Sequence, residues 1–269
     1  IVDLSKGLSE NGVEIVSTGG TSKAISEAGI PVRPVEEVTN FPEMMGGRVK
    51  TLHPLIFGGI LGRDSDKNQM EEHGIENIDM VICNLYPFKS AAEKGVDLSS
   101  LIEEIDIGGP SLLRAASKNH SRVSVVTDPG DYGWILSEIS NGGLTFEQRQ
   151  QLALKSFRHT AEYDSIIQSV LAQRFGEEEL PSSLHLTGIG SPPLRYGENP
   201  HQSSVFYSDL LHSAPSVANS EQLQGKQLSY NNLLDFDAAL AIVMEFDDPT
   251  AVIVTVSYTH LTLPTTVIV

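Results

Sequence analysis

The sequence predicts an α/β fold in which helices pack on a parallel sheet. Short apolar segments, such as 80–88 and 122–128, alternate with longer amphipathic ones, and glycine or proline stands at many of the boundaries. Strands that alternate with helices pair in parallel, because each helix returns the chain to the same edge of the sheet. The chain has 269 residues, of which 40% are hydrophobic and 20% charged. That composition suits a globular protein with a buried core, in one large domain or two of ordinary size.

The N-terminal part of the chain predicts two helices around a short strand. Residues 1–12 are expected to be helical because their apolar side chains fall on one stripe, and 13–17 form an apolar strand. After a Gly-Gly turn comes a helix over 21–29, for which Thr21 is the expected N-cap. The segment 30–38 is expected to be extended, because it contains two prolines.

The middle of the chain continues the alternation. Residues 80–88 predict a buried strand that runs into a proline-terminated loop, and 122–128 predict a second strand. Helices are expected between them over 98–105 and 110–120, the latter with a proline in its first turn. Two further helices are expected near 129–141 and over 145–175.

A change in composition divides the chain. Residues 176–193 are polar and rich in glycine, proline and serine, which is typical of a linker that follows a first domain over 1–175. Beyond the linker, a helix over 235–246 leads into an apolar strand over 250–256. These elements indicate a second, separate module.

Composition also limits the function. The formal net charge of −17, from 18 Lys and Arg against 35 Asp and Glu, repels phosphate backbones, so we expect no nucleic-acid or membrane partner. The apolar runs are too short to cross a membrane, and the N-terminus lacks a signal-peptide pattern. The single cysteine, Cys83, and eight histidines without ligand spacing predict neither a disulfide framework nor a metal site. These features favour a cytoplasmic location.

Cationic side chains gather, against this acidic background, in the glycine-bounded segment GGRVKTLHP at 46–54. It contains Arg48, Lys50 and His53. One interpretation is a solvated surface loop. The other is an anion site, since glycine lets backbone N–H groups approach a ligand while Arg and Lys supply charge.

A strand–glycine–helix turn in EIVSTGGTSKA at 14–24 favours the anion site. Free N–H groups at a helix start attract anions, and the helix dipole strengthens that attraction. The hydroxyls of Ser17, Thr18 and Thr21 add donors. The string is not a Walker motif, which requires a Lys-Ser/Thr pair at fixed spacing.

The string IDIGGPSLLRAASKNH at 105–120 repeats this arrangement. Asp106 precedes a Gly-Gly turn and a helix on which Ser111, Arg114 and Lys118 share one stripe. Such a stripe is also typical of a solvated basic face. The isolation of these cations in an acidic chain favours a ligand site instead.

The predicted strand at 80–88 ends in Asn84, Tyr86 and a proline. Ligands of open parallel sheets bind outside the carboxyl ends of the strands. A tyrosine at that edge can donate to a carbonyl oxygen or contact a ring, although a tyrosine packed under a proline turn is equally compatible with the pattern.

These motifs, in this order, resemble a known family over residues 1–254. The family is the bifunctional purine-biosynthesis enzymes that combine IMP cyclohydrolase with AICAR (aminoimidazole-carboxamide ribonucleotide) formyltransferase. The strings that carry the resemblance are STGGTSKAISEAGIPV, FPEMMGGRVKTLHP, NLYPF, IDIGGPSLLRAASKNH and RYGENPHQ.

The resemblance implies a fold and an activity. It implies a methylglyoxal-synthase-like parallel-sheet domain over 1–175, without its first strand. It also implies a truncated cytidine-deaminase-like α/β module, of which residues 194–254 are the first part. The implied reaction closes formyl-AICAR to IMP with loss of water and needs no cofactor or metal. The family's second activity uses 10-formyltetrahydrofolate as co-substrate, and the parent protein is expected to be a homodimer.

The resemblance also implies roles for individual residues. The implied catalytic residues are Lys50, Tyr86, Asp106 and Lys118. The implied substrate-binding residues are Ser17, Thr18, Gly19, Gly20, Thr21, Arg48, Thr51, Leu52, His53, Asn84, Leu85, Ile107, Gly108 and Gly109. In the second module, Arg195, Tyr196, Asn199, His201 and Asn232 are the implied contacts to AICAR.

Two departures from the family pattern qualify these expectations. The family begins upstream with a strand and a Ser-Asp-Lys-Thr-Gly segment, whereas this chain starts at Ile1. After Val254 the family carries a Lys-His segment, where this chain reads TVSYTHLTLPTTVIV. We therefore expect a non-native tail at 255–269 and no formyl transfer.

Two other functions compete with ring closure. One is a non-catalytic regulatory domain of the same fold that senses a phosphate ligand. It would need the phosphate site but not Tyr86, Asp106 and Lys118. The other is methylglyoxal synthase, which would use aspartates in motifs of its own, and the strings NLYPF and IDIGG disfavour it.

Overall fold

The computed structural model describes residues 1–176, 185, 187–209 and 214–254. The chain divides into two compact units, Ile1–Pro181 and Ser182–Val269. The expected tail at 255–269 lies outside the described residues, and so do residues 177–184 and 186 of the expected linker.

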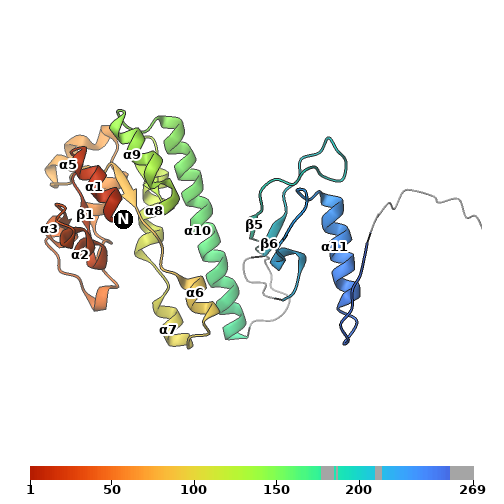
Figure 1. The fold of residues 1–269 in the computed structure, drawn as a ribbon. Helices are drawn as coiled ribbons and strands as arrows, with labels where there is room; N and C mark the ends of the chain where they lie inside the picture. Colours follow the sequence, from red (N-terminus) through yellow and green to blue (C-terminus); the bar gives the residue numbers. More distant parts are fainter. Residues whose placement is uncertain (177–184, 186, 210–213, 255–269) are drawn as a thin grey trace, which may run out of the picture. The chain divides into compact units, whose positions relative to one another are not determined.

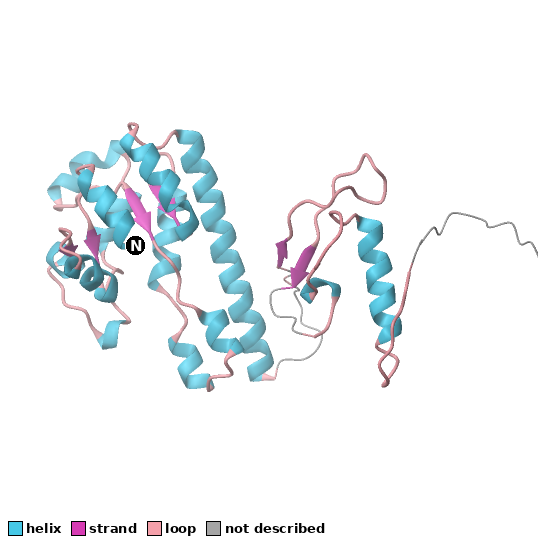
Figure 2. Ribbon diagram, viewed as in Figure 1, coloured by secondary structure: helices cyan, strands magenta, loops and turns pink. Residues whose placement is uncertain are grey.

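The first unit alternates helices with short strands (Figures 1 and 2). Its elements are, in order, α1 (Val2–Glu10), β1 (Val16–Ser17), α2 (Gly19–Glu27), β2 (Arg33–Pro34), α3 (Val35–Thr39), α4 (Pro54–Leu61), α5 (Lys67–Glu72), β3 (Met80–Ile82), α6 (Phe88–Glu93), α7 (Leu98–Glu103), α8 (Gly108–Lys118), β4 (Ser124–Val126), α9 (Tyr132–Ser140) and α10 (Phe146–Phe175).

The strands of this unit form two short parallel pairs. β1 pairs with β2, with Val16 opposite Arg33, and β3 pairs with β4, with Val81 opposite Val125. Parallel pairing agrees with the α/β fold that the alternation of elements predicts. Because β3 and β4 run in the same direction, the residues that follow them lie at one common edge.

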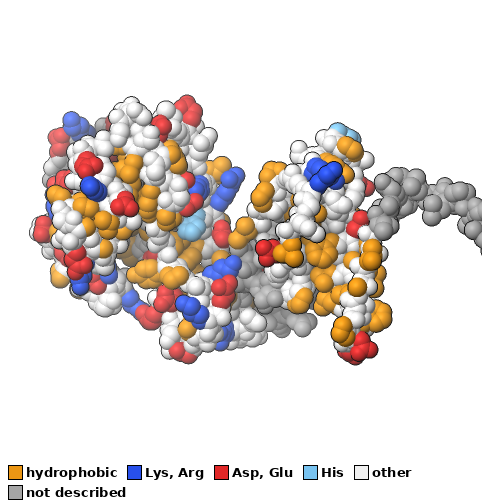
Figure 3. All heavy atoms as spheres, viewed as in Figure 1, with side chains coloured by type: hydrophobic (Ala, Val, Ile, Leu, Met, Phe, Trp, Pro, Cys, Tyr) orange, Lys and Arg blue, Asp and Glu red, His pale blue; other side chains and the backbone are white. Residues whose placement is uncertain are grey.

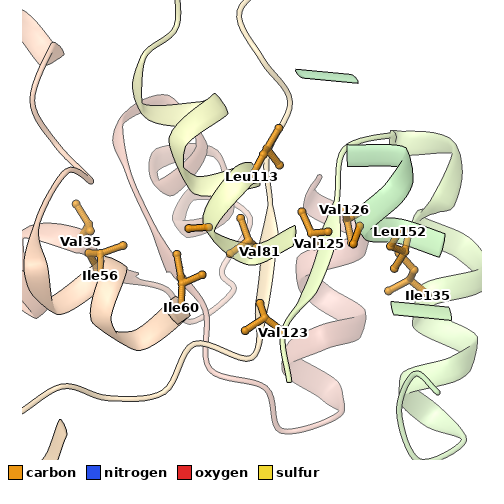
Figure 4. Packing of buried hydrophobic residues seen from close by; sticks show 13 residues of the cluster. Val35, Ile56, Ile60, Val81, Leu113, Val123, Val125, Val126, Ile135 and Leu152 are labelled. Carbon is orange, nitrogen blue, oxygen red and sulfur yellow. The ribbon is translucent and has the colours of Figure 1, made fainter. Parts of the chain in front are cut away.

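The core surrounds β3 and β4 (Figure 4). All residues of β4 are buried, as expected for a strand covered on both faces. Helices α4, α8, α9 and α10 contribute side chains around it. The buried hydrophobic cluster consists of Val35, Ile56, Ile60, Val81, Leu113, Ala115, Ala116, Val123, Val125, Val126, Ile135, Leu152 and Ala153.

Helix α10 runs along one side of the unit and packs against α8, β4 and α6 (Figure 1). A capping box starts it: the Gln148 N–H donates to the Thr145 hydroxyl at 3.2 Å, and the Thr145 N–H donates to Gln148 Oε1 at 2.7 Å. It ends at Gly176, whose φ of 72° is in the left-handed region. The predicted helix over 145–175 is thus confirmed almost to the residue.

Several predicted boundaries were wrong. Helices α2 and α8 begin at their glycine pairs. The N-cap of α2 is Thr18 and not Thr21, because Thr18 is the last residue with extended backbone geometry before the helix. The segment 30–38 is not wholly extended, since α3 starts directly after Pro34. Both prolines precede the helix, where a missing N–H costs no intrahelical hydrogen bond.

The second unit contains an antiparallel pair and one longer helix. β5 (Gly188–Gly190) pairs with β6 (Tyr207–Asp209), and α11 spans Tyr230–Val243. β5 lies in the range expected to be linker. A capping box between Ser229 and Asn232 starts α11 earlier than predicted. The described part of the expected last strand, 250–254, forms no strand.

Helix α11 contains no buried residue, and hydrophobic side chains are exposed on the face of the second unit that carries it (Figure 3). They include Leu234, Ile242, Met244 and Phe246. Among the described residues, no helix is both long and apolar enough to span a bilayer.

Candidate functional site

The carboxyl edge of β3 and β4 meets the start of α8. A Cβ placed on Gly109 would lie 2.4 Å from Oδ2 of Asp106 and 2.8 Å from Cδ2 of Leu85, so only glycine fits there. The N–H of Gly109 donates to Oδ1 of Asp106 at 2.7 Å. Among the described residues, Oδ2 of Asp106 has no hydrogen-bond partner. This oxygen is therefore available to a ligand.

Two adjacent residues, Lys50 and Thr51, link the two glycine pairs. A Cβ placed on Gly108 would lie 3.2 Å from Oγ1 of Thr51. A Cβ placed on Gly19 would lie 3.3 Å from Nζ of Lys50. The segment 46–54 thus reaches the starts of both α2 and α8, which are far apart in sequence.

Lys50 is held by its own turn. Its ammonium pairs with Glu43 at 3.1 Å, and the two side chains are 23% and 35% exposed. A Cβ placed on Gly47 would lie 2.7 Å from Cε of Lys50, and Gly47 has a φ of 95°. Glycine is required at this position for both reasons.

The start of α2 is open. Thr18 has extended backbone geometry and makes no side-chain capping bond. Gly19, with a φ of 48°, is exposed, and nothing lies within 4 Å of a Cβ placed on Gly20. The hydroxyls of Ser17 and Thr21 lie on either side of these glycines in the chain. The Thr18 side chain therefore leaves the backbone N–H groups of this helix start without a capping bond, and N–H groups of this kind bind anions.

The other residues of the segment 46–54 have structural contacts. Nδ1 of His53 accepts a hydrogen bond from the Leu55 N–H at 3.2 Å and thereby caps α4. The Arg48 guanidinium donates to the Glu103 carboxylate, which raises its pKa. Leu52 is exposed. Arg48 is therefore engaged by a carboxylate at the surface rather than directed to the glycine pairs.

Asn84, at the end of β3, is held on both sides. Its Nδ2 donates to the Thr127 carbonyl at 2.9 Å, and its Oδ1 accepts from the Tyr132 hydroxyl at 3.0 Å. Burial raises the pKa of Tyr132. In the next turn Tyr86 is 50% exposed. The side chain of Asn84 therefore fixes the loop, and Tyr86 remains free to meet a ligand.

The sequence interpretation missed Tyr163, on α10. Its hydroxyl accepts from the Asp106 N–H at 2.9 Å and donates to the Glu104 carbonyl at 3.1 Å. Burial raises the pKa of this phenol, and burial also raises the pKa of Cys83 to about 12. The available signal was weak, because Tyr163 lies within a helical pattern in which it reads as an ordinary core residue.

Lys118 is not brought together with Asp106. The two stand at opposite ends of α8, whose axis measures roughly 15 Å. The next residue, Asn119, donates to the carbonyls of Ile60 and Gly62, away from the carboxyl edge of β3. Ile107 is exposed at the start of the same helix.

In the second unit, Arg195 and Tyr196 form a separate cluster. The Arg195 guanidinium lies 4.9 Å from the Tyr196 ring centroid and donates to its hydroxyl at 3.2 Å. Hydrogen bonding with Ser229 and the charge of Arg195 lower the pKa of Tyr196. Asn232 caps α11 by accepting from the Ser229 N–H at 3.1 Å.

The remaining two residues predicted in this unit lie on a turn. The Asn199 N–H donates to Oε1 of Gln202 at 2.8 Å, and His201 is exposed. In neither unit do the described residues include a group of histidine, cysteine and carboxylate side chains that could hold a metal ion.

Two family descriptions match the chain. The description "MGS-like domain" matches residues 1–111, and "AICARFT/IMPCHase bienzyme" matches residues 116–260. The second match covers more than half of the chain.

Curated relatives and a solved structure agree with these matches. The chain is 54% identical to the bifunctional purine biosynthesis protein PurH of Oceanobacillus iheyensis over 258 residues, and 50% identical to that of Persephonella marina over 260 residues. Each match covers 94% of this chain and 50% of the relative, so the chain spans about half the length of these relatives. A crystal structure described as that of ForH matches with a TM-score of 0.54 and 34% identity, over 63% of this chain and 91% of that one.

Proposed function

Because this chain belongs to the AICARFT/IMPCHase bienzyme family, we propose that it is an enzyme of purine biosynthesis that closes formyl-AICAR to IMP. The observation that carries the proposal is that two adjacent residues reach the two glycine pairs: Lys50 lies beside Gly19, and Thr51 lies beside Gly108. It places a cation and a hydroxyl between an open helix start and a free carboxylate oxygen. Those are the groups that a phosphorylated amide substrate needs.

The phosphate would bind at the start of α2. The helix dipole and the free N–H groups of Gly19 and Gly20 favour an anion there, and Lys50 adds a full charge. The hydroxyls of Ser17, Thr18 and Thr21 serve as further donors. A phosphate at this point directs the rest of the nucleotide along residues 50–51 toward Asp106.

Ring closure would take place beside Asp106. The carboxamide nitrogen attacks the formyl carbon and a C–N bond forms. The formyl C–O bond then breaks, and the oxygen leaves as water with one proton from the carboxamide nitrogen and one from the formamide nitrogen. A neutral amide is a weak nucleophile, so orientation and stabilisation of charge on the formyl oxygen supply most of the catalysis. Oδ2 of Asp106 accepts from the carboxamide N–H, and Tyr86 donates to the formyl oxygen. This chemistry requires no metal or redox cofactor.

Lys118 needs a different explanation, because α8 separates it from Asp106. We assign it to the site of a second copy in a homodimer, since it is exposed at the far end of the helix. In the second unit, Arg195 and Tyr196 would contact AICAR in the formyl transfer of the complete protein, with 10-formyltetrahydrofolate as co-substrate. For this chain alone we expect no formyl transfer.

The direct test is incubation of the purified protein with formyl-AICAR while the absorbance of IMP is followed. We expect turnover by the wild-type chain and a loss of about 100-fold or more for Asp106→Asn, the range for a positioned proton acceptor. Asp79→Asn is the matched control, because Asp79 flanks the opposite end of β3 and is largely exposed. Nucleotide binding without turnover would contradict the proposal and support the regulatory alternative.

A further inference from the structure

We propose that Tyr163 is a positioning residue that holds the Asp106 loop and the Tyr86 loop in register with each other. The inference rests on the proposed function, because it concerns the same site. Tyr163 lies on α10 and is not among the residues that we assign to the substrate. It contacts the Asp106 loop through its hydroxyl and the Tyr86 loop through its ring.

The hydroxyl of Tyr163 holds the Asp106 loop. It accepts from the Asp106 N–H at 2.9 Å and donates to the Glu104 carbonyl at 3.1 Å, so both of its hydrogen-bonding functions are used. These two backbone groups lie between the end of α7 and the start of α8. Without the hydroxyl, no other described side chain bonds to either of them.

The ring of Tyr163 holds the other loop. It packs edge-on against Phe88, with ring centroids 6.5 Å apart and an interplanar angle of 73°. Phe88 is 1% exposed and stands two residues after Tyr86, and its N–H donates to the Tyr86 carbonyl at 2.8 Å. A displacement of Phe88 therefore moves the backbone of Tyr86.

Burial makes these contacts specific. Tyr163 is 7% exposed on a helix that packs against α8, β4 and α6, so its position is set by the core. A phenylalanine would fill the same volume. A buried phenol is retained where its hydroxyl has partners, and here both partners belong to the loop that carries Asp106.

The two fixed points of Asp106 are different atoms. Tyr163 holds its backbone N–H, whereas the Gly109 N–H holds Oδ1 of its side chain. Together they leave only Oδ2 to the substrate. Loss of the Tyr163 hydroxyl would release the backbone and let the carboxylate shift by a fraction of an ångström or more, which is enough to reduce the rate of an oriented reaction.

The test compares Tyr163→Phe with Thr160→Val. Thr160 stands one turn away on α10, is 1% exposed, and donates to the Phe157 carbonyl at 3.1 Å, so its variant also loses a buried hydroxyl. We expect Tyr163→Phe to lower kcat about tenfold to a hundredfold with little change in KM, and Thr160→Val to keep the wild-type kcat. In the Asp106→Asn background, Tyr163→Phe should add no further loss. Equal losses of kcat in both variants would show a packing effect and overturn the proposal.

Amide hydrogen exchange tests the hydrogen bond from the Asp106 N–H to the Tyr163 hydroxyl without measuring turnover. In the wild type the Asp106 amide should exchange as slowly as helical amides although it lies outside α7 and α8, and a freely exchanging amide would contradict the proposal. Tyr163→Phe should raise its exchange rate about two- to tenfold, the equivalent of one hydrogen bond, and Thr160→Val should not. If the wild type fails to close the ring, the proposed function is wrong, and the exchange rates still decide whether Tyr163 positions Asp106.

Discussion

The two Gly-Gly helix starts share a sequence pattern but differ in what their first turns face. At α2, Thr18 makes no capping bond and the space beside Gly20 is open. At α8, Asp106 places a carboxylate against the Gly109 N–H. A helix start carries about half a positive charge. That charge is offset by a side chain at α8 and remains available to a ligand at α2.

The difference teaches that a glycine pair before a helix does not by itself identify a phosphate site. The two starts differ in the residue three positions before the second glycine, which is Asp106 before Gly109 and Ser17 before Gly20. A carboxylate there repels phosphate and suits the proton acceptor that we propose for α8. A hydroxyl leaves the helix start open to the phosphate that we propose for α2.

The largest expected effect comes from removing the cation at the open start. Lys50→Ala should lower kcat/KM for formyl-AICAR about 10- to 100-fold, because loss of a hydrogen bond to the charged phosphate costs about 1.5–3 kcal/mol. Steady-state kinetics measures the loss. Lys67→Ala is the control, since Lys67 is an exposed lysine that pairs with Glu71 one turn along α5, and it should leave kcat/KM unchanged.

Lys118 extends this experiment to a second copy. Lys118→Ala should also lose most of its activity, and a refolded mixture with Lys50→Ala should regain about a quarter of the wild-type rate, because half of the dimers then contain one intact site. A mixture without activity would show that Lys118 does not serve a second copy.

A smaller effect separates the two glycine pairs by stability. Gly109→Ala should destabilise the protein by about 1–3 kcal/mol, because its Cβ would overlap Asp106 and Leu85. Gly20→Ala should stabilise it by about 0.5–1 kcal/mol, because its Cβ meets open space and alanine loses less entropy in a helix. Urea unfolding followed by circular dichroism measures both. Similar losses at the two positions would remove the contrast between the helix starts.

The smallest effect concerns the acidic turn after β4, which contains Asp128. Lys155 donates to Asp128 at 2.7 Å and lowers the pKa of its carboxyl. Because this pKa is lower in the folded state, the stabilisation is full above the ordinary carboxyl pKa and is lost as the pH falls through the folded value. Asp128→Asn should therefore cost less than about 1 kcal/mol at pH 7, since the pair is half-exposed, and nothing in strong acid.

Unfolding measured from neutral to acidic pH checks this dependence. A difference in stability between wild type and Asp128→Asn that grows as the pH falls would have the wrong sign. That result would show that the ion pair with Lys155 is not the reason why Asp128 stabilises the folded protein.

The sequence predicted the alternation of elements because periodicity is local. The long helix α10 and the buried strand β4 were predicted from their apolar patterns. Helix starts were less accurate, because glycine pairs that can begin a helix also form turns. The error at α3 had the same origin, since a proline in an extended segment can also stand directly before a helix.

The candidate site was predictable where its residues carry unusual local signals. Lys50 and Asp106 stand beside glycines, and the structure brings their segments together through Thr51 and Gly108. Tyr163 was not predictable, because its role depends on a contact between residues 57 positions apart. The separation of Lys118 from Asp106 follows from the length of a helix, and a shared stripe does not reveal it.

The ion pair between Lys50 and Glu43 has a consequence for how a ligand enters. In the free protein the ammonium already has an anionic partner, so the phosphate of the proposed substrate would replace a carboxylate instead of meeting a bare cation. Binding at this point is then an exchange of partners, and its net free energy is the difference between two ion pairs. Glu43 then acts as a resident competitor, which supplies the lysine with a partner again when the phosphate of the product leaves.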